Sequence, residues 1–160
     1  MNIKTLGALA ALALLSACAS KPADTGNAMS NSTTAPMAPS IVPGSQEDLV
    51  ANVGDRVFYE FNQSVLSDEA QATLTKQATW LGKYPNVTVQ LAGNCDERGT
   101  EEYNLALGNR RANAARDFLV AKGVSTSRIT TISYGKDRPV ALGSNEQAWA
   151  QNRNAITSVK

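Results

Sequence analysis

The segment from Val87 to Leu119, VTVQLAGNCDERGTEEYNLALGNRRANAARDFL, carries the pattern that decides the fold. In its first part Val87, Val89 and Leu91 alternate with polar residues, which predicts a half-buried strand. After a polar loop, a helix is expected to begin near Glu101. Its helically spaced residues are mostly small, so this helix should lie close against a sheet. They are Leu105, Gly108, Ala112, Ala115 and Leu119.

The segments on either side show the same alternation between a period of two residues and a helical period. Arg56–Phe61 is aromatic and β-branched, which predicts a strand. The further elements expected are a helix from Ser67 that ends before Pro85, a strand over Ile129–Tyr134, a short helix over Asn145–Gln151 and a strand over Ala155–Val159. The order β-α-β-α-β-(α)-β predicts an α+β fold in which a mixed β-sheet has its helices packed on one side.

The composition excludes several functional classes. Hydrophobic residues make up 42% of the 160, enough for one globular domain with extensions. Fifteen Lys and Arg face fourteen Asp and Glu, and this balance argues against nucleic-acid binding. Because the chain contains no histidine, Ser-His-Asp and Cys-His catalytic sites and His-ligated zinc are excluded. From the sequence we expect a protein that is not an enzyme and that binds no cofactor and no metal.

The first 17 residues have the pattern of an export signal. Lys4 is their only charge, and Leu6–Leu15 is an apolar run too short for a stable membrane span. Cys18 follows, and the tetrad from Leu15 to Cys18 resembles the bacterial lipobox, in which the Cys thiol becomes acylated and the N-terminal residue after cleavage. Ala19, rather than Asp, resembles lipoproteins that pass on to the outer membrane. The alternative is an ordinary secretory signal followed by a chance cysteine.

Residues 18–44 are expected to form a lipidated cysteine and a flexible tether, and residues 45–160 a folded domain. Small and polar residues dominate positions 19–44, so little apolar surface is available there to offset the entropy of ordering. Cys18 and Cys95 are the only cysteines. If Cys18 is acylated, Cys95 has no intramolecular partner, and an inert packed thiol is expected.

The polar loop from Gly93 to Thr100 is the candidate binding site. It lies between a strand and a helix N-terminus, and it contains Asp96, while Arg111 follows on the helix. One carboxylate and one guanidinium suit a zwitterion, because the first accepts hydrogen bonds from an ammonium and the second forks onto a carboxylate. From the residues alone, it is also possible that Asp96 and Arg111 pair with each other or belong to a solvated surface.

The residues of this loop and helix resemble the OmpA-like peptidoglycan-binding domain family. The resemblance covers about Val57 to Val159. The segments that carry it are Asp96–Thr100, Glu102–Asn104, Arg110–Asn113, Ser133–Pro139 and Gln151–Arg153. The lipobox and the tether match the lipoprotein branch of this family independently.

The resemblance implies a ligand and the residues that bind it. In that family an Asp and an Arg at the positions of Asp96 and Arg111 grip the meso-diaminopimelate residue of the peptidoglycan stem peptide. Asp96 would take its ammonium and Arg111 its carboxylate. The further ligand-binding residues implied are Asn94, Cys95, Leu107, Phe61 and Asn62.

Three positions depart from the family pattern. Asn94 replaces the usual His, Cys95 replaces a small residue, and Asn154 replaces the second Arg of an Asn-Arg-Arg run. A main-chain contact at Asn94 and Cys95 tolerates the first two changes, whereas any side-chain role of the Arg is lost. Arg153 is expected to assist at most.

The resemblance also implies partners. It implies an outer-membrane lipoprotein, with its domain in the periplasm, that anchors the membrane to the cell wall and works with the propeller protein TolB and the Tol complex in envelope constriction during cell division. Two alternatives remain: a wall-binding lipoprotein without a Tol role, and a cell-wall hydrolase with paired carboxylates such as Asp96 and Glu97.

Overall fold

The computed structural model describes residues 41–160, so the expected signal segment, Cys18 and most of the expected tether lie outside the described residues. The described part contains four strands, four α-helices and one 3₁₀ turn. In chain order they are α1 (Gln46–Asn52), β1 (Arg56–Phe58), α2 (Asp68–Lys83), β2 (Val89–Asn94), α3 (Glu101–Ala121), η1 (Thr126–Arg128), β3 (Ile129–Gly135), α4 (Glu146–Asn152) and β4 (Asn154–Val159).

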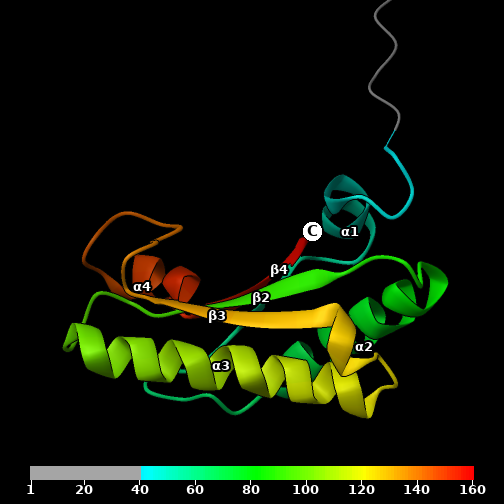
Figure 1. Cartoon of the computed structure of the whole chain (residues 1–160). Coiled ribbons are helices and arrows are strands. Elements are labelled where there is room, and N and C mark those ends of the chain that lie inside the picture. The colour runs from blue at the N-terminus through cyan, green and yellow to red at the C-terminus, as the bar shows by residue number, and fades with distance from the viewer. Residues whose placement is uncertain (1–40) are drawn as a thin grey trace, which may run out of the picture. The chain divides into compact units, whose positions relative to one another are not determined.

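The strands form one mixed sheet in the order β1-β4-β2-β3. β2 runs parallel to β3, whereas β4 is antiparallel to both of its neighbours, β1 and β2. The two long helices α2 and α3 lie on the same side of the sheet, and α3 follows β2 and β3 along their length (Figure 1). The predicted α+β architecture is therefore confirmed.

Local sequence explains where the two long helices begin. The Ser67 hydroxyl accepts a hydrogen bond from the Ala70 amide at the start of α2, and Thr100 accepts one from the Tyr103 amide at the start of α3. Each hydroxyl satisfies a backbone N–H that the first helical turn leaves free. Acidic residues in both first turns also stabilise the N-termini of these helices, because their negative charges are attracted to the positive end of the helix dipole.

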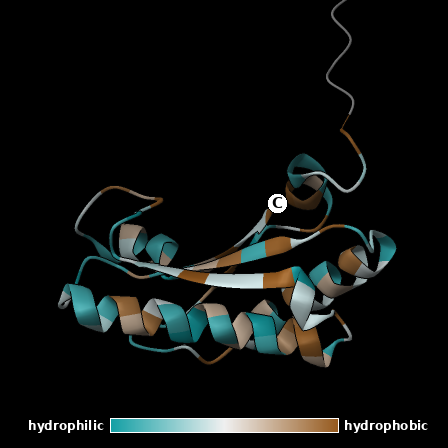
Figure 2. Ribbon diagram, viewed as in Figure 1, coloured by the Kyte–Doolittle hydropathy of each residue, from teal (hydrophilic) through white to brown (hydrophobic). Residues whose placement is uncertain are grey.

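The core lies between the sheet and the long helices. Leu74 and Leu81 of α2, Val89 and Leu91 of β2 and Leu119 of α3 are nearly or completely buried there. Figure 2 shows hydrophobic and hydrophilic residues alternating along α3, as expected for a helix with one face on a sheet. The side chains that alternate with the core residues of β2 point to the other face of the sheet.

Three details differ from the sequence-based expectation. Helix α1 was not expected; Ser45 caps it, and its Asp48 carboxylate accepts from the Trp80 indole and the Gly44 amide. Strand β1 ends at Phe58 rather than Phe61, because the chain turns at Glu60–Gln63. Leu105 is 38% exposed and does not belong to the buried face of α3, which is centred on Asn104, Leu107, Gly108 and Arg111 instead.

Two glycines set the close approach of α3 to β2. A Cβ atom on Gly93 would lie 1.8 Å from the carbonyl oxygen of Gly108, and one on Gly108 would lie 2.7 Å from the carbonyl oxygen of Gly93. Both clashes are with backbone atoms, so no side-chain rotation can relieve them. The predicted close packing of this small-sided helix is confirmed, and its reason is steric.

We expect Gly93→Ala to lower the free energy of unfolding by about 3 kcal/mol, because α3 must move away from the sheet. Gly82→Ala is the matched control, since a Cβ there has nothing within 4 Å, and alanine in a helix should leave stability unchanged or raise it by about 0.5–1 kcal/mol. Urea unfolding of the full chain, followed by circular dichroism, measures both. Equal stability of the two variants would contradict this account of the packing.

Candidate functional site

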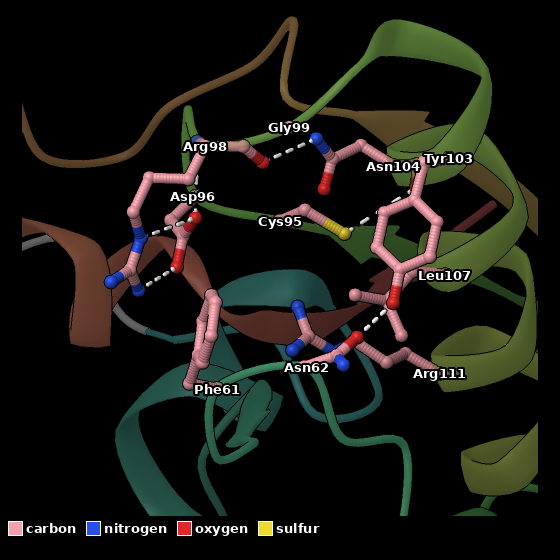
Figure 3. Close-up of a pocket in the computed structure, with 10 residues that line it drawn as sticks. All are labelled: Phe61, Asn62, Cys95, Asp96, Arg98, Gly99, Tyr103, Asn104, Leu107 and Arg111. Carbon is pink, nitrogen blue, oxygen red and sulfur yellow. Dashed lines mark hydrogen bonds and ion pairs between the residues drawn. The ribbon is translucent and has the colours of Figure 1, made fainter.

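A pocket of about 170 Å³ lies where the end of β2, the start of α3 and the turn after β1 meet. Figure 3 shows Asp96 and Arg98 on one side and Tyr103, Leu107 and Arg111 on the opposite side, where α3 lies. The lining residues are Phe61, Asn62, Cys95, Asp96, Arg98, Gly99, Tyr103, Asn104, Leu107 and Arg111. Six of the seven ligand-binding residues expected from the sequence are thus in one pocket, and Asn94 is the exception.

Arg111 lies at the base of the pocket and is fully buried. Its Nε, Nη1 and Nη2 atoms donate to the backbone carbonyls of Gln63, Asn94 and Glu60 at 2.8, 2.7 and 3.1 Å. Burial lowers the pKa of this guanidinium, but from an ordinary value so high that it stays charged. A guanidinium has five N–H donors, so these bonds leave two that are not used by carbonyls.

Asp96 is 4% exposed and is held by other guanidinium groups, not by Arg111. Arg98 donates to both carboxylate oxygens, at 2.6 Å from Nη2 and 3.2 Å from Nε, and Arg153 Nη1 lies 3.5 Å away. Burial opposes ionisation, but the hydrogen bonds from Arg98 and the nearby guanidinium of Arg153 outweigh it and keep the pKa of Asp96 below its usual value.

The side chain of Arg98 covers Asp96 and is itself held between two aromatic rings. Its guanidinium carbon lies 4.0 Å from the ring centre of Phe61 and 4.1 Å from that of Trp149. The Trp149 indole donates to Glu97 Oε1 at 3.0 Å, which fixes the ring. Arg98 therefore forms a wall of the pocket, a role that the sequence alone did not indicate.

Asn94 contributes through its backbone. Its carbonyl oxygen accepts from Arg111, while its side chain is directed elsewhere and donates to Asn154 Oδ1 at 2.7 Å. The adjacent Cys95 thiol is 3% exposed, and burial raises its pKa. Cys95 forms no disulfide within residues 41–160, and its Sγ lies 3.4 Å from the Asn104 carbonyl.

Arg153 has a larger part in the site than the sequence indicated. Besides approaching Asp96, it donates from Nε to the Tyr59 carbonyl at 3.1 Å and from Nη2 to Glu146 at 2.7 Å. Arg153 lies at the end of α4, 57 positions after Asp96, and no local motif connects the two residues. Only the fold brings them together.

The mouth of the pocket is closed on one side by a contact between Tyr103 and Asn62, in which the phenol hydroxyl donates to the Asn62 side-chain oxygen. Asn62 has a φ of 57°, in the left-handed region that Asn tolerates better than most residues. The Asn104 amide donates to the Arg98 carbonyl at 2.8 Å and so fixes the loop that carries Asp96. These two polar contacts shape the rim.

Within residues 41–160, no group of three His, Cys, Asp or Glu side chains is placed to hold a metal ion. In the same range no helix is both long and apolar enough to cross a membrane.

The fold and the site identify the family. Residues 58–153 match the model of the OmpA family, which is more than half of the chain, and the protein belongs to that family.

Within this family, the chain is similar to proteins named peptidoglycan-associated lipoprotein. The chain is 48% identical over 152 residues to a peptidoglycan-associated lipoprotein of Mesorhizobium japonicum, an alignment covering 95% of this chain and 89% of the relative. It is 43% identical to the protein of the same name from Pseudomonas aeruginosa, with 96% of both chains covered. None of these names denotes a catalytic activity.

Solved structures agree with the family. The crystal structure of the peptidoglycan-associated lipoprotein from Burkholderia pseudomallei is 42% identical, with a TM-score of 0.65, and covers 66% of this chain and 90% of its own. The C-terminal domain of Helicobacter pylori MotB is 18% identical with a TM-score of 0.62, covering 66% of this chain and 84% of its own, and shares the fold.

The ion pairs of Asp96 predict a pH-dependent stability. Because its pKa is lowered in the folded state, Asp96 stabilises the fold above the ordinary value of 3.8, and this contribution is lost as the pH falls through the lowered pKa. We expect Asp96→Asn to reduce the free energy of unfolding by about 2 kcal/mol at pH 7, and the difference from the unmutated chain to shrink as the pH is lowered.

Urea unfolding at several pH values measures this effect. Asp117→Asn is the matched control, because the Asp117 side chain is 67% exposed in its ion pair with Arg116, and its loss should change stability by less than about 0.5 kcal/mol. A pH-independent cost of Asp96→Asn would show that charge at Asp96 does not stabilise the fold.

Proposed function

We propose that the protein binds peptidoglycan non-covalently and anchors the outer membrane to the cell wall. The relatives named peptidoglycan-associated lipoprotein, together with membership of the OmpA family, support cell-wall anchoring. The observation that carries the proposal for the site is that the Asp96 and Arg111 side chains line the same small pocket. The proposed ligand is the free end of meso-diaminopimelate in the stem peptide, which bears one ammonium and one carboxylate.

Arg111 is proposed to bind the carboxylate of this end. Three backbone carbonyls hold its guanidinium in one orientation, so little side-chain entropy remains to be lost when a ligand binds. The two donors not used by carbonyls supply the planar fork that matches a carboxylate. Binding this group also compensates a buried positive charge.

Asp96 is proposed to accept from the ammonium, and this requires sharing with Arg98. Arg98 already occupies both oxygens, but its side chain is 32% exposed at the wall of the pocket. The ammonium therefore exchanges with or joins one of the Arg98 donors, while the buried Arg153 keeps its contact with Asp96. Arg98 and Arg153 contact Asp96, and Arg153 also pairs with Glu146. Arg111 has no acidic partner within residues 41–160, so the excess charge of the site is positive and the ligand carboxylate is expected to contribute most of the affinity.

The size of the pocket favours an amino-acid end over a sugar chain. Its volume of about 170 Å³ is below the roughly 300–1,000 Å³ typical of pockets for drug-sized ligands. A disaccharide of the glycan strand would not fit, whereas the end of one amino-acid side chain does. Leu107 supplies an apolar wall for the methylene groups.

The electrostatics support binding rather than hydrolysis. A glycoside hydrolase needs one carboxyl with a raised pKa to act as the acid. The pKa values of Asp96 and Glu97 are both lowered, Asp96 by its arginine contacts against the effect of burial, and Glu97 by hydrogen bonds from Ser144 and Trp149. We therefore keep the hydrolase only as an outcome to be tested by incubation with peptidoglycan.

The membrane anchor is proposed to be the acylated Cys18, with the domain in the periplasm. More than one acyl chain is needed for a stable anchor, because a single chain binds membranes only marginally. The intact mass of the membrane-extracted protein reports cleavage before Cys18 and its acyl chains, and a mass that fits a Cys18–Cys95 disulfide would exclude the anchor.

A role with TolB and the Tol complex in envelope constriction rests on the resemblance to the lipoprotein branch of the family. The rim of the pocket is compatible with a protein partner, since Phe61 and Tyr103 line it and are exposed. Such a partner would compete with peptidoglycan. The alternative is a wall-binding lipoprotein without a Tol role, and a pull-down of the full chain with TolB separates the two.

We expect stem peptides with meso-diaminopimelate to bind at least tenfold more tightly than peptides with lysine, which lacks the distal carboxylate, corresponding to about 1.4 kcal/mol or more. Isothermal titration calorimetry with the full chain measures this. Leu107→Ala is expected to weaken both peptides alike, because it removes only apolar contact. Equal affinity for the two peptides would overturn the role of Arg111.

A further inference from the structure

A groove of about 460 Å³ lies on the face of the sheet opposite the long helices. The core residues Val89 and Leu91 of β2 face α2 and α3, so the intervening Gln90 and Ala92 face the other way. The groove is lined by these two and by Asn94, Tyr134, Arg138, Pro139, Val140, Ile156, Ser158 and Lys160. None of its lining residues belongs to the diaminopimelate pocket described above.

The groove contains a buried acceptor without a partner. Asn154 Nδ2 donates to the Gln151 carbonyl, so Asn154 Oδ1 is the acceptor for Asn94 Nδ2. This chain of bonds fixes the orientation of both amides and leaves Asn94 Oδ1 without a hydrogen bond, although Asn94 is 2% exposed. A buried unsatisfied acceptor is costly, and a ligand N–H would remove that cost once the side chains that cover Asn94 Oδ1 move aside.

The groove also carries a positive charge that is held in place. The Arg138 guanidinium lies 3.7 Å from the ring centre of Tyr134, and the stacking leaves its N–H edge free to donate. Within residues 41–160 Arg138 takes part in none of the ion pairs, and no acidic side chain lines the groove. Asp137, its neighbour in sequence, is exposed outside the lining.

Part of the remaining floor is apolar, and Gln90, Ser158 and Lys160 make the rest of it polar. Ala92 and Ile156 are neighbours across β2 and β4, and Pro139 and the 44% exposed Val140 form the adjacent wall. An extended chain presents alternate side chains to one face and its backbone N–H groups at regular intervals. In the groove, the apolar part of the floor would contact an apolar side chain of such a chain, Asn94 Oδ1 would accept from one of its backbone N–H groups, and Arg138 would bind a carboxylate.

We propose that this groove is a second binding site, which takes an extended acidic peptide segment of a partner protein. The charge of Arg138, the free acceptor of Asn94 and the apolar floor favour such a segment over a sugar, which would leave the floor uncovered, and over a cation. The groove and the pocket proposed for peptidoglycan share no lining residue. Asn94 nevertheless connects the two sites, because its side chain lines the groove and its carbonyl accepts a hydrogen bond from Arg111 in the pocket.

The test is an NMR titration of the ¹⁵N-labelled full chain with a capped peptide of alternating glutamate and valine. The measured quantity is the change in amide chemical shifts. We expect changes at Ala92, Ile156 and the Asn94 side-chain amide, and no binding of the matched lysine–valine peptide. Arg138→Gln should weaken binding at least fivefold. Arg110→Gln, which removes an exposed charge on α3, should leave it unchanged.

Val140→Glu provides a second variant that keeps the fold, because Val140 is 44% exposed, and the added charge should weaken binding by repulsion. The proposal fails if the shifts occur at Arg98 and Tyr103, since the peptide would then occupy the diaminopimelate pocket. It also fails if Arg110→Gln and Arg138→Gln have equal effects, if the peptide does not bind, or if the groove shifts appear only with phosphatidylglycerol vesicles.

Discussion

The site depends on the hydrogen bonds that the buried Arg111 guanidinium donates to three backbone carbonyls. The carbonyls of Glu60 and Gln63 belong to the turn after β1, and that of Asn94 ends β2. The Tyr59 hydroxyl adds a bond to the Arg111 carbonyl at 2.8 Å. One side chain of α3 thus joins two loops that are far apart in sequence. Removing it would take the guanidinium donor from the Gln63 and Asn94 carbonyls, while the Glu60 carbonyl would keep only its bond from the Gln63 amide. Arg111 is therefore structural as well as a proposed ligand contact.

The same charge explains how the rest of the pocket is arranged. Arg111 does not pair with Asp96, because backbone carbonyls hold it and Arg98 and Arg153 hold the carboxylate. The pocket consequently keeps a positive group that can bind a carboxylate, whereas a direct Asp–Arg ion pair would have left both groups satisfied. The ion pair between Arg98 and Asp96 also keeps the buried Asp96 carboxylate charged and balances its charge in the structure without a ligand.

Two departures from the family pattern are one structural unit. Asn94 and Asn154 are 60 residues apart and donate and accept across neighbouring strands at 2.7 Å. Each looks like an isolated feature of the sequence, but in the fold the two neutral amides are buried and bonded to each other. Their bond leaves the buried Asn94 Oδ1 without a hydrogen-bond partner, and the proposed groove site uses this acceptor.

Periodicity and helix caps, which are local properties, predicted the strands and the two long helices in their order, and the resemblance to a known family supplied six of the residues that line the pocket but not Arg98. The sequence missed α1, the early end of β1 and the exposure of Leu105, since these depend on Asp48 reaching Trp80, on a turn and on the exact rotation of α3. The partners of each charged side chain became clear only from the folded structure. Arg98 stacks between Phe61 and Trp149, and Arg153 reaches Asp96 from α4, because the fold brings distant segments within contact distance, where burial makes each unpaired charge costly.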